Sequence, residues 1–464
     1  MAGEWPVLTL REAGVQLIDC EHRTPPPADE GYPYVAIPQV KGGRLDLSDA
    51  RLISHEHFVE WTRKASPQQW DVIVSWRCNP GEAAVVPAGL QCALAQNLVL
   101  LRADGSRVAP EFLRWLVRSP TWWEQVQTLI NVGAVFDSLK CADIPHFMMP
   151  IPPLAEQRAI AQTLGTLDDK IELNRRMNEM LEGIARAIFK SWFIDFDPVH
   201  RNAARRRNQP SPAASRHPLP MGEGWDEGAV ETLDRLFPDS FEDSDLGQIP
   251  AGWEVKPLSE FTTAITKGTT PTQEGIDTAP EGGARIKYVR VNAIGEDGAI
   301  LFDKLTTIPE LVHRGVLKRS VLRVNDVLYT IAGTIGRISV VEVSLLPANT
   351  NQAVAIIRPK PAIPSDFLVF TMRQEAFREE LHSNIVHAVQ ANLSLGMLSR
   401  ARAVVPPMEM LPQLFRPIDD VVKRILANRT ESRTLAALRD TLLPKLISGE
   451  LRVKDAERFI EGRD

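Results

Sequence analysis

The stretch PPLAEQRAIAQTLGTLDDKIELNRRMNEMLEGIARAIFKSWF occupies residues 152–193. Its apolar residues recur at alternating intervals of four and three, which is the a/d spacing of a helix that packs along one face. A short polar interruption lies in the middle of this seam. The spacing predicts one long, two-faced helix whose seam contains Ile160, Leu164, Leu167, Ile171, Asn174, Asn178, Leu181, Ala185, Ile188 and Trp192.

The same pattern returns near the C-terminus, because a shift of 406 − 152 = 254 residues lays Pro152-Pro153 on Pro406-Pro407. Asn174 then meets Asn428. If the two helices pack antiparallel, these asparagines lie together at a pseudo-twofold centre, where a buried polar pair costs stability but defines register. The alternative is that both are exposed. The second seam contains Leu414, Ile418, Val421, Ile425, Asn428, Ser432, Leu435, Arg439, Leu442 and Leu446.

Three prolines distinguish the second helix from the first. Pro412 and Pro417 fall near its start, and a proline inside a helix removes a backbone hydrogen bond. We therefore expect straight helix only from near Pro417, with this proline in the first turn. We also expect Pro444 to disrupt or end the helix.

Length and composition set broad limits. A chain of 464 residues is too long to fold around a single hydrophobic core, so we expect two or three domains. The formal net charge of −6 does not exclude nucleic-acid binding, because a local basic face suffices. The N-terminus lacks a secretion signal, and no apolar run reaches membrane-spanning length, so we expect a cytoplasmic protein. We expect reduced thiols and no close metal-binding pair at Cys20, Cys78, Cys92 and Cys141.

Residues 1–151 read as a mixed α/β unit. Strands are expected within WPVLTL, YPYVAI, DVIVSW and QNLVLLR, and helices after Pro110 and Pro120. Trp115, Trp122 and Trp123 are expected to be core or domain contacts. The predicted boundaries are 1–151 for the first unit, 152–197 for the central helix, 198–246 for a linker and lead-in, 247–405 for the second unit, 406–453 for the C-terminal helix and 454–464 for a tail.

The segment after the central helix is rich in arginine and proline. Pro210, Pro212, Pro218 and Pro220 oppose regular structure, so a linker is expected there. Its basic residues either touch phosphate or are simply solvated. They are Arg201, Arg205, Arg206 and Arg207. An acidic stretch over residues 223–245 is expected to form an ordered lead-in to the second unit.

From Gly252 the first unit is repeated. Trp253 falls near Trp5, and GTTPT at 268–272 echoes HRTPP at 22–26. From Tyr34 onward the matching positions lie 254 to 256 residues apart, a drift of only two residues. The order unit, helix, unit, helix therefore predicts an internal duplication of a mixed α/β fold with two long antiparallel coiled-coil helices. The matching pairs include Tyr34-Val35 with Tyr288-Val289, Asp71-Val72 with Asp326-Val327, Gly81 with Gly336, Gln96 with Gln352 and Arg102 with Arg358.

The sequence lacks the patterns of several catalytic sites. It contains no G-x-x-x-x-G-K-[ST] phosphate loop, and its proline pairs lack the neighbours that an adenine methyltransferase uses. The GTIG run at Gly333–Gly336 is weak by itself. No histidine falls at metal-ligand spacing with another His or Cys. We therefore expect no metal site, no cofactor in this chain and no catalytic residue.

The chain resembles the specificity subunit of type I restriction-modification systems. The resemblance rests on the PPLAEQRAIAQTLGTLDDKIELNRR run, the LFPDSFEDSDLGQIPAGWE lead-in, the LRDTLLPKLISGEL ending and the duplicated order. It implies two target-recognition domains that read a split, asymmetric DNA site. It also implies two modification subunits that use S-adenosylmethionine to methylate adenine, and restriction subunits that use ATP and Mg to translocate and cut DNA.

A helix over residues 155–193 would span roughly 58 Å. The helix pair would then set the distance between half-sites, expected at about 34 Å. Charged residues on its outer faces and ends, Arg175, Arg176, Lys190 and Arg429, would dock the modification subunits.

Expected DNA contacts come from side-chain chemistry, because Arg can read guanine, Asn can read adenine and Gly admits a phosphate. Each of them alone can equally be a solvated charge. The first unit offers Lys41, Arg44, Arg63, Lys64 and Arg77. The second offers Arg290, Asn292, Lys318, Arg319, Thr334, Gly336 and Arg337. Two other functions remain open: a DNA-binding regulator without enzyme partners, and a coiled-coil scaffold that binds proteins.

Overall fold

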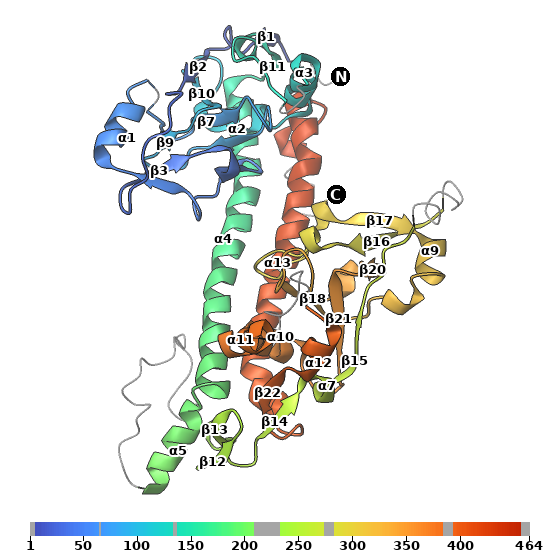
Figure 1. Cartoon of the computed structure of the whole chain (residues 1–464). Helices are drawn as coiled ribbons and strands as arrows, with labels where there is room; N and C mark the ends of the chain where they lie inside the picture. The colour runs from blue at the N-terminus through green and yellow to red at the C-terminus, as the bar shows by residue number, and fades with distance from the viewer. Residues whose placement is uncertain are drawn as a thin grey trace. The chain divides into compact units, whose positions relative to one another are not determined.

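The computed structural model describes residues 5–64, 66–132, 137–207, 233–272, 283–383 and 393–455. The chain divides into two compact units, Met1–Arg175 with Asn428–Asp464, and Arg176–Ala427. The two long helices in Figure 1, α4 (Leu154–Phe193) and α13 (Leu411–Ser448), contribute residues to both units. Each unit is described by itself below.

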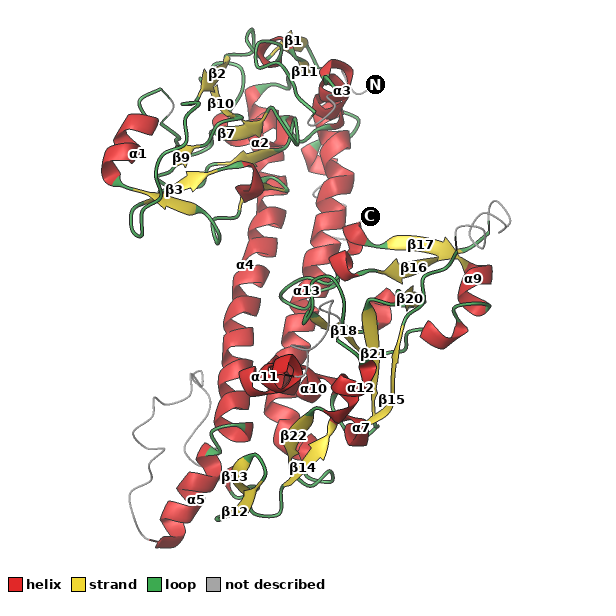
Figure 2. Ribbon diagram, in the orientation of Figure 1, coloured by secondary structure: helices red, strands yellow, loops and turns green. Residues whose placement is uncertain are grey.

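The first unit is built around a four-stranded sheet of order β2-β10-β7-β8 and a three-stranded sheet of order β6-β3-β9. The pairs β1-β11 and β4-β5 complete its strands, drawn in yellow in Figure 2. Its elements before α4 are β1 Val7–Thr9, β2 Val15–Asp19, β3 Tyr32–Val35, β4 Val40–Lys41, β5 Arg44–Leu45, β6 Arg51–Ile53, α1 His55–Trp61, β7 Val72–Ser75, β8 Ala83–Val85, β9 Ala93–Leu94, β10 Leu98–Ala103, α2 Pro110–Leu116, α3 Pro120–Leu129 and β11 Met148–Pro150.

The second unit repeats these strand orders. Its four-stranded sheet is β15-β21-β18-β19, its three-stranded sheet is β17-β16-β20, and β14 pairs with β22. A further pair, β12-β13, precedes them. Its elements are β12 Phe241–Ser244, β13 Gly247–Pro250, β14 Glu254–Pro257, α7 Leu258–Phe261, β15 Thr262–Lys267, β16 Arg285–Val289, β17 Thr306–Pro309, α9 Glu310–Arg314, β18 Val327–Thr330, β19 Ile338–Val340, β20 Ala348–Thr350, β21 Val354–Pro359, α10 Ser365–Arg373, α11 Glu375–Ser383, α12 Leu395–Arg400 and β22 Arg402–Val405.

Both units are mixed α/β, as the sequence predicted. The two larger sheets have the same strand order and the same strand directions in both units. The antiparallel pair β1-β11 of the first unit corresponds to the antiparallel pair β14-β22 of the second. β3 pairs antiparallel with β6 and parallel with β9, and β16 pairs antiparallel with β17 and parallel with β20. The central strand of each three-stranded sheet thus has one antiparallel and one parallel neighbour. The chain therefore follows the same path through this sheet in both units.

Each unit has its own hydrophobic core, and the long helices supply part of both cores. In the first unit Trp115 and Trp122 are fully buried beside Leu164 of α4 and Leu446 of α13. The predicted role of these two tryptophans in the core is confirmed, and Trp123 packs at the edge of the same core. In the second unit the corresponding stretch of α4 contributes Phe189, Trp192 and Phe193.

Helix α13 begins at Leu411 and continues to Ser448, so the predicted start near Pro417 and the predicted break at Pro444 are both wrong. Pro412 occupies the second helical position, where its missing N–H has no partner to lose. Pro417 and Pro444 each remove one backbone hydrogen bond. Burial of the apolar face on either side offsets that loss, since Leu414, Phe415, Ile418, Leu442, Leu443 and Leu446 are all buried.

The segment after α4 also differs from the expected linker. Residues Asp197–Arg207 form helix α5, and its arginines pair with the acidic lead-in. Arg201 makes a bidentate pair with the buried Asp234 at 2.5 and 2.8 Å, and Arg206 contacts Asp239 at 3.0 Å. The basic run is therefore held by carboxylates inside the second unit. The four prolines of the expected linker lie outside the described residues.

The length and polarity of the helices also bear on membranes. Among the residues that the structure describes, no helix combines the length and the apolar character that crossing a bilayer requires.

Candidate nucleic-acid interface

A tyrosine at the end of a parallel strand is held in the same way in both units. Tyr34 in β3 donates its hydroxyl hydrogen bond to the carbonyl of Arg23 at 3.1 Å, and Tyr288 in β16 donates to the carbonyl of Thr269 at 2.8 Å. Both rings are buried. The hydrogen bond ties the HRTPP and GTTPT segments, which echo one another in the sequence, to the three-stranded sheets.

A buried ion pair is also repeated. Arg102 of β10 grips Asp71 through Nε and Nη2 at 2.8 and 2.6 Å, and Arg358 of β21 grips Asp326 at 2.7 Å through both atoms. Each aspartate is nearly inaccessible, with side-chain exposures of 3% and 1%. These charges are internally satisfied, so they hold the four-stranded sheets together and are unsuited to contact a ligand.

Two of the predicted basic groups occupy equivalent places. Arg63 and Lys64 follow α1, and Lys318 and Arg319 lie in the 3-10 turn after α9. Both helices follow the antiparallel neighbour of the central strand, and each begins four residues after the partner of the buried tyrosine, Arg51 or Thr306. All four side chains are exposed, and Lys64 contacts Glu21 at 3.3 Å. The repeat therefore presents an exposed pair of cations at the same place in each unit.

The GTIGR turn between β18 and β19 has a structural reason for its glycine. Gly336 has φ +95° and donates its N–H to the carbonyl of Thr330 at 3.0 Å, as Gly81 with φ +89° donates to Ser75 in the first unit. The amide of Gly336 is thus engaged in closing the turn. Thr334 is exposed at the tip of this turn.

Arg337 at the end of this turn is held by its neighbours. Its guanidinium donates to the carbonyl of Ile294 at 2.9 Å and contacts Glu296 at 3.2 Å. Thr334 is therefore better placed than Arg337 to meet a ligand.

The remaining first-unit candidates lie on short strands and their connections. Lys41 of β4 contacts Asp46 at 3.2 Å, and Arg44 of β5 contacts Glu172 of α4 at 3.1 Å. Arg77 is exposed in the turn between β7 and β8. Because exposed ion pairs of this kind contribute little, Lys41 and Arg44 remain available to exchange carboxylate for phosphate.

One group of site residues was not predicted from the sequence. In the first unit a cavity of about 470 Å³ is lined by Thr24, Tyr34, Gln96 and their neighbours at the end of β3. Thr270 and Gln352, the counterparts of Thr24 and Gln96, are hydrogen-bonded to each other in the second unit. The signal was present in the sequence as the repeat of these residues between the units, but their common location became visible only in three dimensions.

Comparison with known proteins finds similarity to one group of DNA-recognition subunits. Residues 26–183 match the family model of the type I restriction modification DNA specificity domain. The HindI specificity subunit of Haemophilus influenzae is 23% identical over 77% of this chain and 81% of its own length. The MjaX specificity subunit of Methanocaldococcus jannaschii, a putative type I restriction enzyme subunit, is 21% identical over 91% of this chain and 88% of its own. The chain is thus similar to type I restriction enzyme specificity subunits, and its residues 26–183 match their DNA specificity domain.

A solved structure has a similar fold. The crystal structure of the type I S subunit from M. genitalium covers 95% of this chain and 96% of its own, with a TM-score of 0.50 at 15% identity. At this identity the likeness concerns the fold, which is the arrangement of mixed α/β units and long helices.

The long helices pack antiparallel within each unit. In the first unit Asp168 contacts Arg439 at 2.6 Å and Asn174 contacts Glu431 at 2.8 Å. In the second, Asn178 donates to the carbonyl of Ile425 at 3.4 Å. The residue numbers rise along α4 as they fall along α13, which defines the antiparallel direction.

The predicted seam residues are largely inaccessible. Asn174 and Asn428 are 0% and 2% exposed, and Nδ2 of Asn174 lies 3.5 Å from the carbonyl oxygen of Asn428, so the alternative in which both are exposed does not hold. The buried apolar members are Ile160, Leu164, Leu167, Ala185, Ile188, Trp192, Leu414, Ile418, Ile425, Leu442 and Leu446. The half-buried members are Ile171, Leu181, Val421 and Leu435.

The first unit carries a charged cluster at its helix seam that the second unit lacks among its described residues. Asp168 is buried between Arg439 at 2.6 Å and Arg118 at 3.4 Å. Burial lowers the pKa of Arg118, and the nearby carboxylate of Asp168 opposes that shift. The positions 254 residues away hold Ala185 and Val422, both buried. The polar seam therefore differs between the units although the scaffold is shared.

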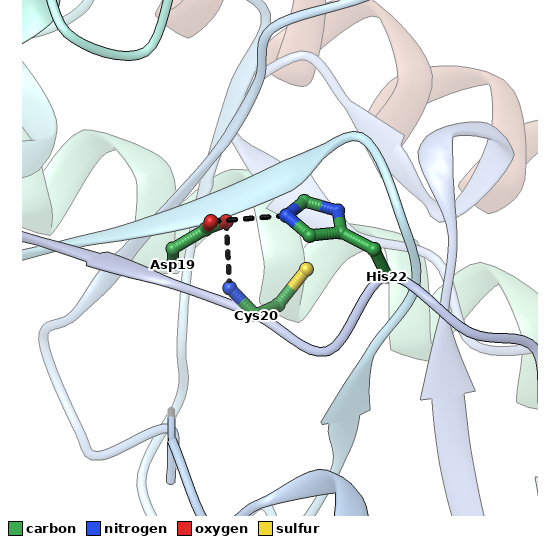
Figure 3. Close-up of side chains that lie close together, drawn as sticks. All are labelled: Asp19, Cys20 and His22. Atoms are coloured by element: carbon green, nitrogen blue, oxygen red, sulfur yellow. Dashed lines mark hydrogen bonds and ion pairs between the residues drawn. The ribbon is translucent and has the colours of Figure 1, made fainter.

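Asp19, Cys20 and His22 come together at the end of β2, as Figure 3 shows, with possible ligand atoms within 4.8 Å of one another. The expectation that no histidine lies near a cysteine at ligand distance is therefore wrong here. The Cys20 thiol donates to the carbonyl of Ala95 at 3.3 Å, and burial raises its pKa to about 12. A metal ligand must be a thiolate, so this environment opposes coordination and we assign no metal.

Proposed function

We propose that this chain reads a bipartite, asymmetric DNA site with a fixed spacer and thereby directs its partner subunits to methylate adenine or restrict DNA. The similarity to type I specificity subunits carries this proposal, together with the presence in both units of one scaffold. Two identical readers would select a palindrome, whereas two related but different readers select two different half-sites. The units share their sheets, buried ion pair and tyrosine, and differ on their surfaces.

The chain is proposed to be an internal duplication with pseudo-twofold symmetry. The repeated strand orders support it, as do the repeated contacts of Tyr34 with Tyr288 and of Asp71 with Asp326. We propose 1–151 and 247–405 as the target-recognition domains. The central helix and C-terminal helix, proposed over 152–197 and 406–453, separate the half-sites. Between 198 and 246 we now place α5 and its acidic partner segment rather than a plain linker.

The repeated basic pairs are proposed to contact phosphate. A phosphate contact carries no sequence information, so both units need it at the same place. Arg63 with Lys64, and Lys318 with Arg319, satisfy that requirement. Lys41, Arg44 and Arg77 are proposed as further contacts of the first unit. Arg290, Asn292 and Thr334 are proposed for the second, with Gly336 and Arg337 supporting the turn.

The partner surface is proposed on the outer faces of the long helices. Arg175, Arg176, Lys190 and Arg429 are charged residues of these faces. Two modification subunits would supply S-adenosylmethionine chemistry, and restriction subunits would supply ATP-driven translocation with Mg. The chain itself is proposed to be non-catalytic.

Mapping of N6-methyladenine across the genome tests the proposal. Cells that carry this gene with its neighbouring modification gene are compared with cells in which this gene alone is deleted. We expect a split motif with a constant gap that loses methylation in the deletion and regains it on complementation. Unchanged methylation, with all subunits expressed, would instead favour a regulator or a protein-binding scaffold.

A further inference from the structure

The two units share one backbone frame immediately after the buried tyrosine. Ala36, two residues after Tyr34, has φ −114° and ψ 177°, and Arg290, two residues after Tyr288, has φ −111° and ψ 168°. A 3-10 turn follows in each, Ile37–Gln39 and Val291–Ala293. The frame thus holds its side chains in the same directions in both units.

The frame is anchored by residues common to the two units. The N–H of the third turn residue donates to the carbonyl of residue 36 or 290, at 3.0 and 2.9 Å. The tyrosine hydroxyl fastens the strand to the preceding segment in both units. Position and orientation are therefore constant, and a difference in function must come from the side chains that the frame carries.

Those side chains differ in chemistry. Ala36 and Pro38 offer only apolar surface, whereas Arg290 and Asn292 offer a guanidinium and a carboxamide, and both of these are exposed. The Arg290 guanidinium carbon lies 5.9 Å from the centre of the Tyr288 ring. The next residue in the first unit, Gln39, is buried and accepts a hydrogen bond from the N–H of Ala36 at 3.1 Å, so it supports the frame.

In the first unit the frame also borders the cavity described above. In the first unit Ala36 and Pro38 line the cavity of about 470 Å³ together with Thr24, Tyr34 and Gln96. The last three have identical counterparts in the second unit. The residues common to both units thus form one part of the lining of this first-unit cavity, and Ala36 and Pro38, which differ between the units, form another part.

We infer that residues 36 and 38 in the first unit, and 290 and 292 in the second, are the specificity-determining positions of the two half-sites. This rests on the proposed function. Arg290 suits guanine, through O6 and N7, and Asn292 suits adenine, through N6 and N7. Ala36 and Pro38 can contact a thymine methyl group but cannot read a hydrogen-bonding edge. The second half-site therefore contains a G·C and an A·T pair at positions that the first half-site reads without these hydrogen bonds.

Single substitutions in the full complex with its modification subunits test the inference. Arg290→Ala and Asn292→Ala are each expected to relax one base position of the second half-site, with about a 5- to 150-fold loss of discrimination there. The first half-site and the gap should be unchanged. Lys318→Ala is the matched control, expected to weaken methylation evenly at every site without changing the motif. Methylation mapping gives all of these readouts at once.

The reciprocal graft is the second arm. Ala36→Arg is compatible with the backbone, because Arg290 adopts nearly the same angles, and it should add a preference for guanine to the first half-site. An unchanged motif in Arg290→Ala, Asn292→Ala and Ala36→Arg would overturn the inference. If Arg290→Ala abolishes all methylation, Arg290→Gln decides, because Gln pairs with adenine rather than guanine. A motif that changes at this one position supports base reading, and an unchanged motif contradicts it. Failure of the proposed function is distinct, since the wild-type gene would then direct no methylation.

Discussion

At the scale of single residues, comparison of the two units distinguishes buried residues that are identical in both from exposed residues that differ. Asp326 is nearly inaccessible, and it accepts two hydrogen bonds from Arg358 and one from the N–H of Arg323. Asp71 makes the corresponding contacts with Arg102 and the N–H of Gln68. Such residues are identical in both units because their partners are internal, whereas Arg290 has no reason to match Ala36.

Removal of one member of this pair should be costly. Asp326→Ala leaves the Arg358 guanidinium largely buried without its carboxylate, so we expect a loss of about 3 kcal/mol in the free energy of unfolding. Urea denaturation measures this loss. Asp303→Ala, in the exposed Asp303–Lys304 pair, is the control and should change stability by less than about 0.5 kcal/mol. The double variant Asp326→Leu with Arg358→Met should recover most of the loss, and a cost of Asp326→Ala no larger than that of the control would contradict the role of the pair.

At the scale of elements, a buried asparagine lowers the stability of the long helix pair but defines how the two helices align. The buried Asn174 donates through Nδ2 to Glu431 at 2.8 Å and to Ser432 at 3.3 Å, but its Oδ1 is buried with no hydrogen-bond partner. An unpaired buried oxygen costs roughly 1–3 kcal/mol. A polar residue retained at such a cost is typical of positions that define the alignment of two helices.

Replacement of this asparagine should therefore stabilise the helix pair. Asn174→Leu removes the unpaired oxygen and adds apolar burial, and we expect a gain of about 1 kcal/mol in the free energy of unfolding. Met180→Leu, at an exposed position of the same helix, serves as the control with no significant change. Thermal and urea unfolding of both variants provide the measurement. Destabilisation by Asn174→Leu would show that the hydrogen bonds outweigh the unpaired oxygen.

At the scale of the whole molecule, a chain of net charge −6 must bind a polyanion through local basic groups. The repeated pairs Arg63 with Lys64 and Lys318 with Arg319 are the proposed local groups. Many other arginines are held by carboxylates, as Arg201 is by Asp234. The net charge therefore does not locate the interface. The positions of exposed cations, as opposed to cations paired with carboxylates, indicate where DNA can bind.

This distribution predicts the salt dependence of DNA binding. The affinity of the complex for its site should fall steeply with salt, and Lys318→Ala with Arg319→Ala should reduce the slope of log K against log salt by about 2. Arg63→Ala with Lys64→Ala should do the same. Lys423→Ala with Arg424→Ala, on α13, is the control pair and should leave the slope unchanged. Equal slopes for all variants would exclude the two pairs as phosphate contacts.

The sequence by itself predicted the mixed α/β class, the two long helices and the repeat of strands that both units show, because repeat spacing and apolar periodicity are properties of the chain. Tyr34 and Tyr288, 254 residues apart, already marked equivalent strands. The strands expected at residues 5–10, 32–37 and 71–76 contain β1, β3 and β7, and the one expected at 96–102 overlaps β10, which ends at Ala103. The family resemblance followed from motifs that are contiguous along the chain.

Only the tertiary structure decided how these parts are used. Helix α13 passes through Pro417 because packing of its apolar face outweighs one lost hydrogen bond, a balance that local propensity does not contain. Arg201 is paired with Asp234, which lies 33 residues away in the sequence. It is therefore not the solvated or phosphate-binding cation that the sequence suggested. The shared frame at Ala36 and Arg290 joins segments that are distant in sequence, and such proximity is set by long-range strand pairing rather than by spacing along the chain.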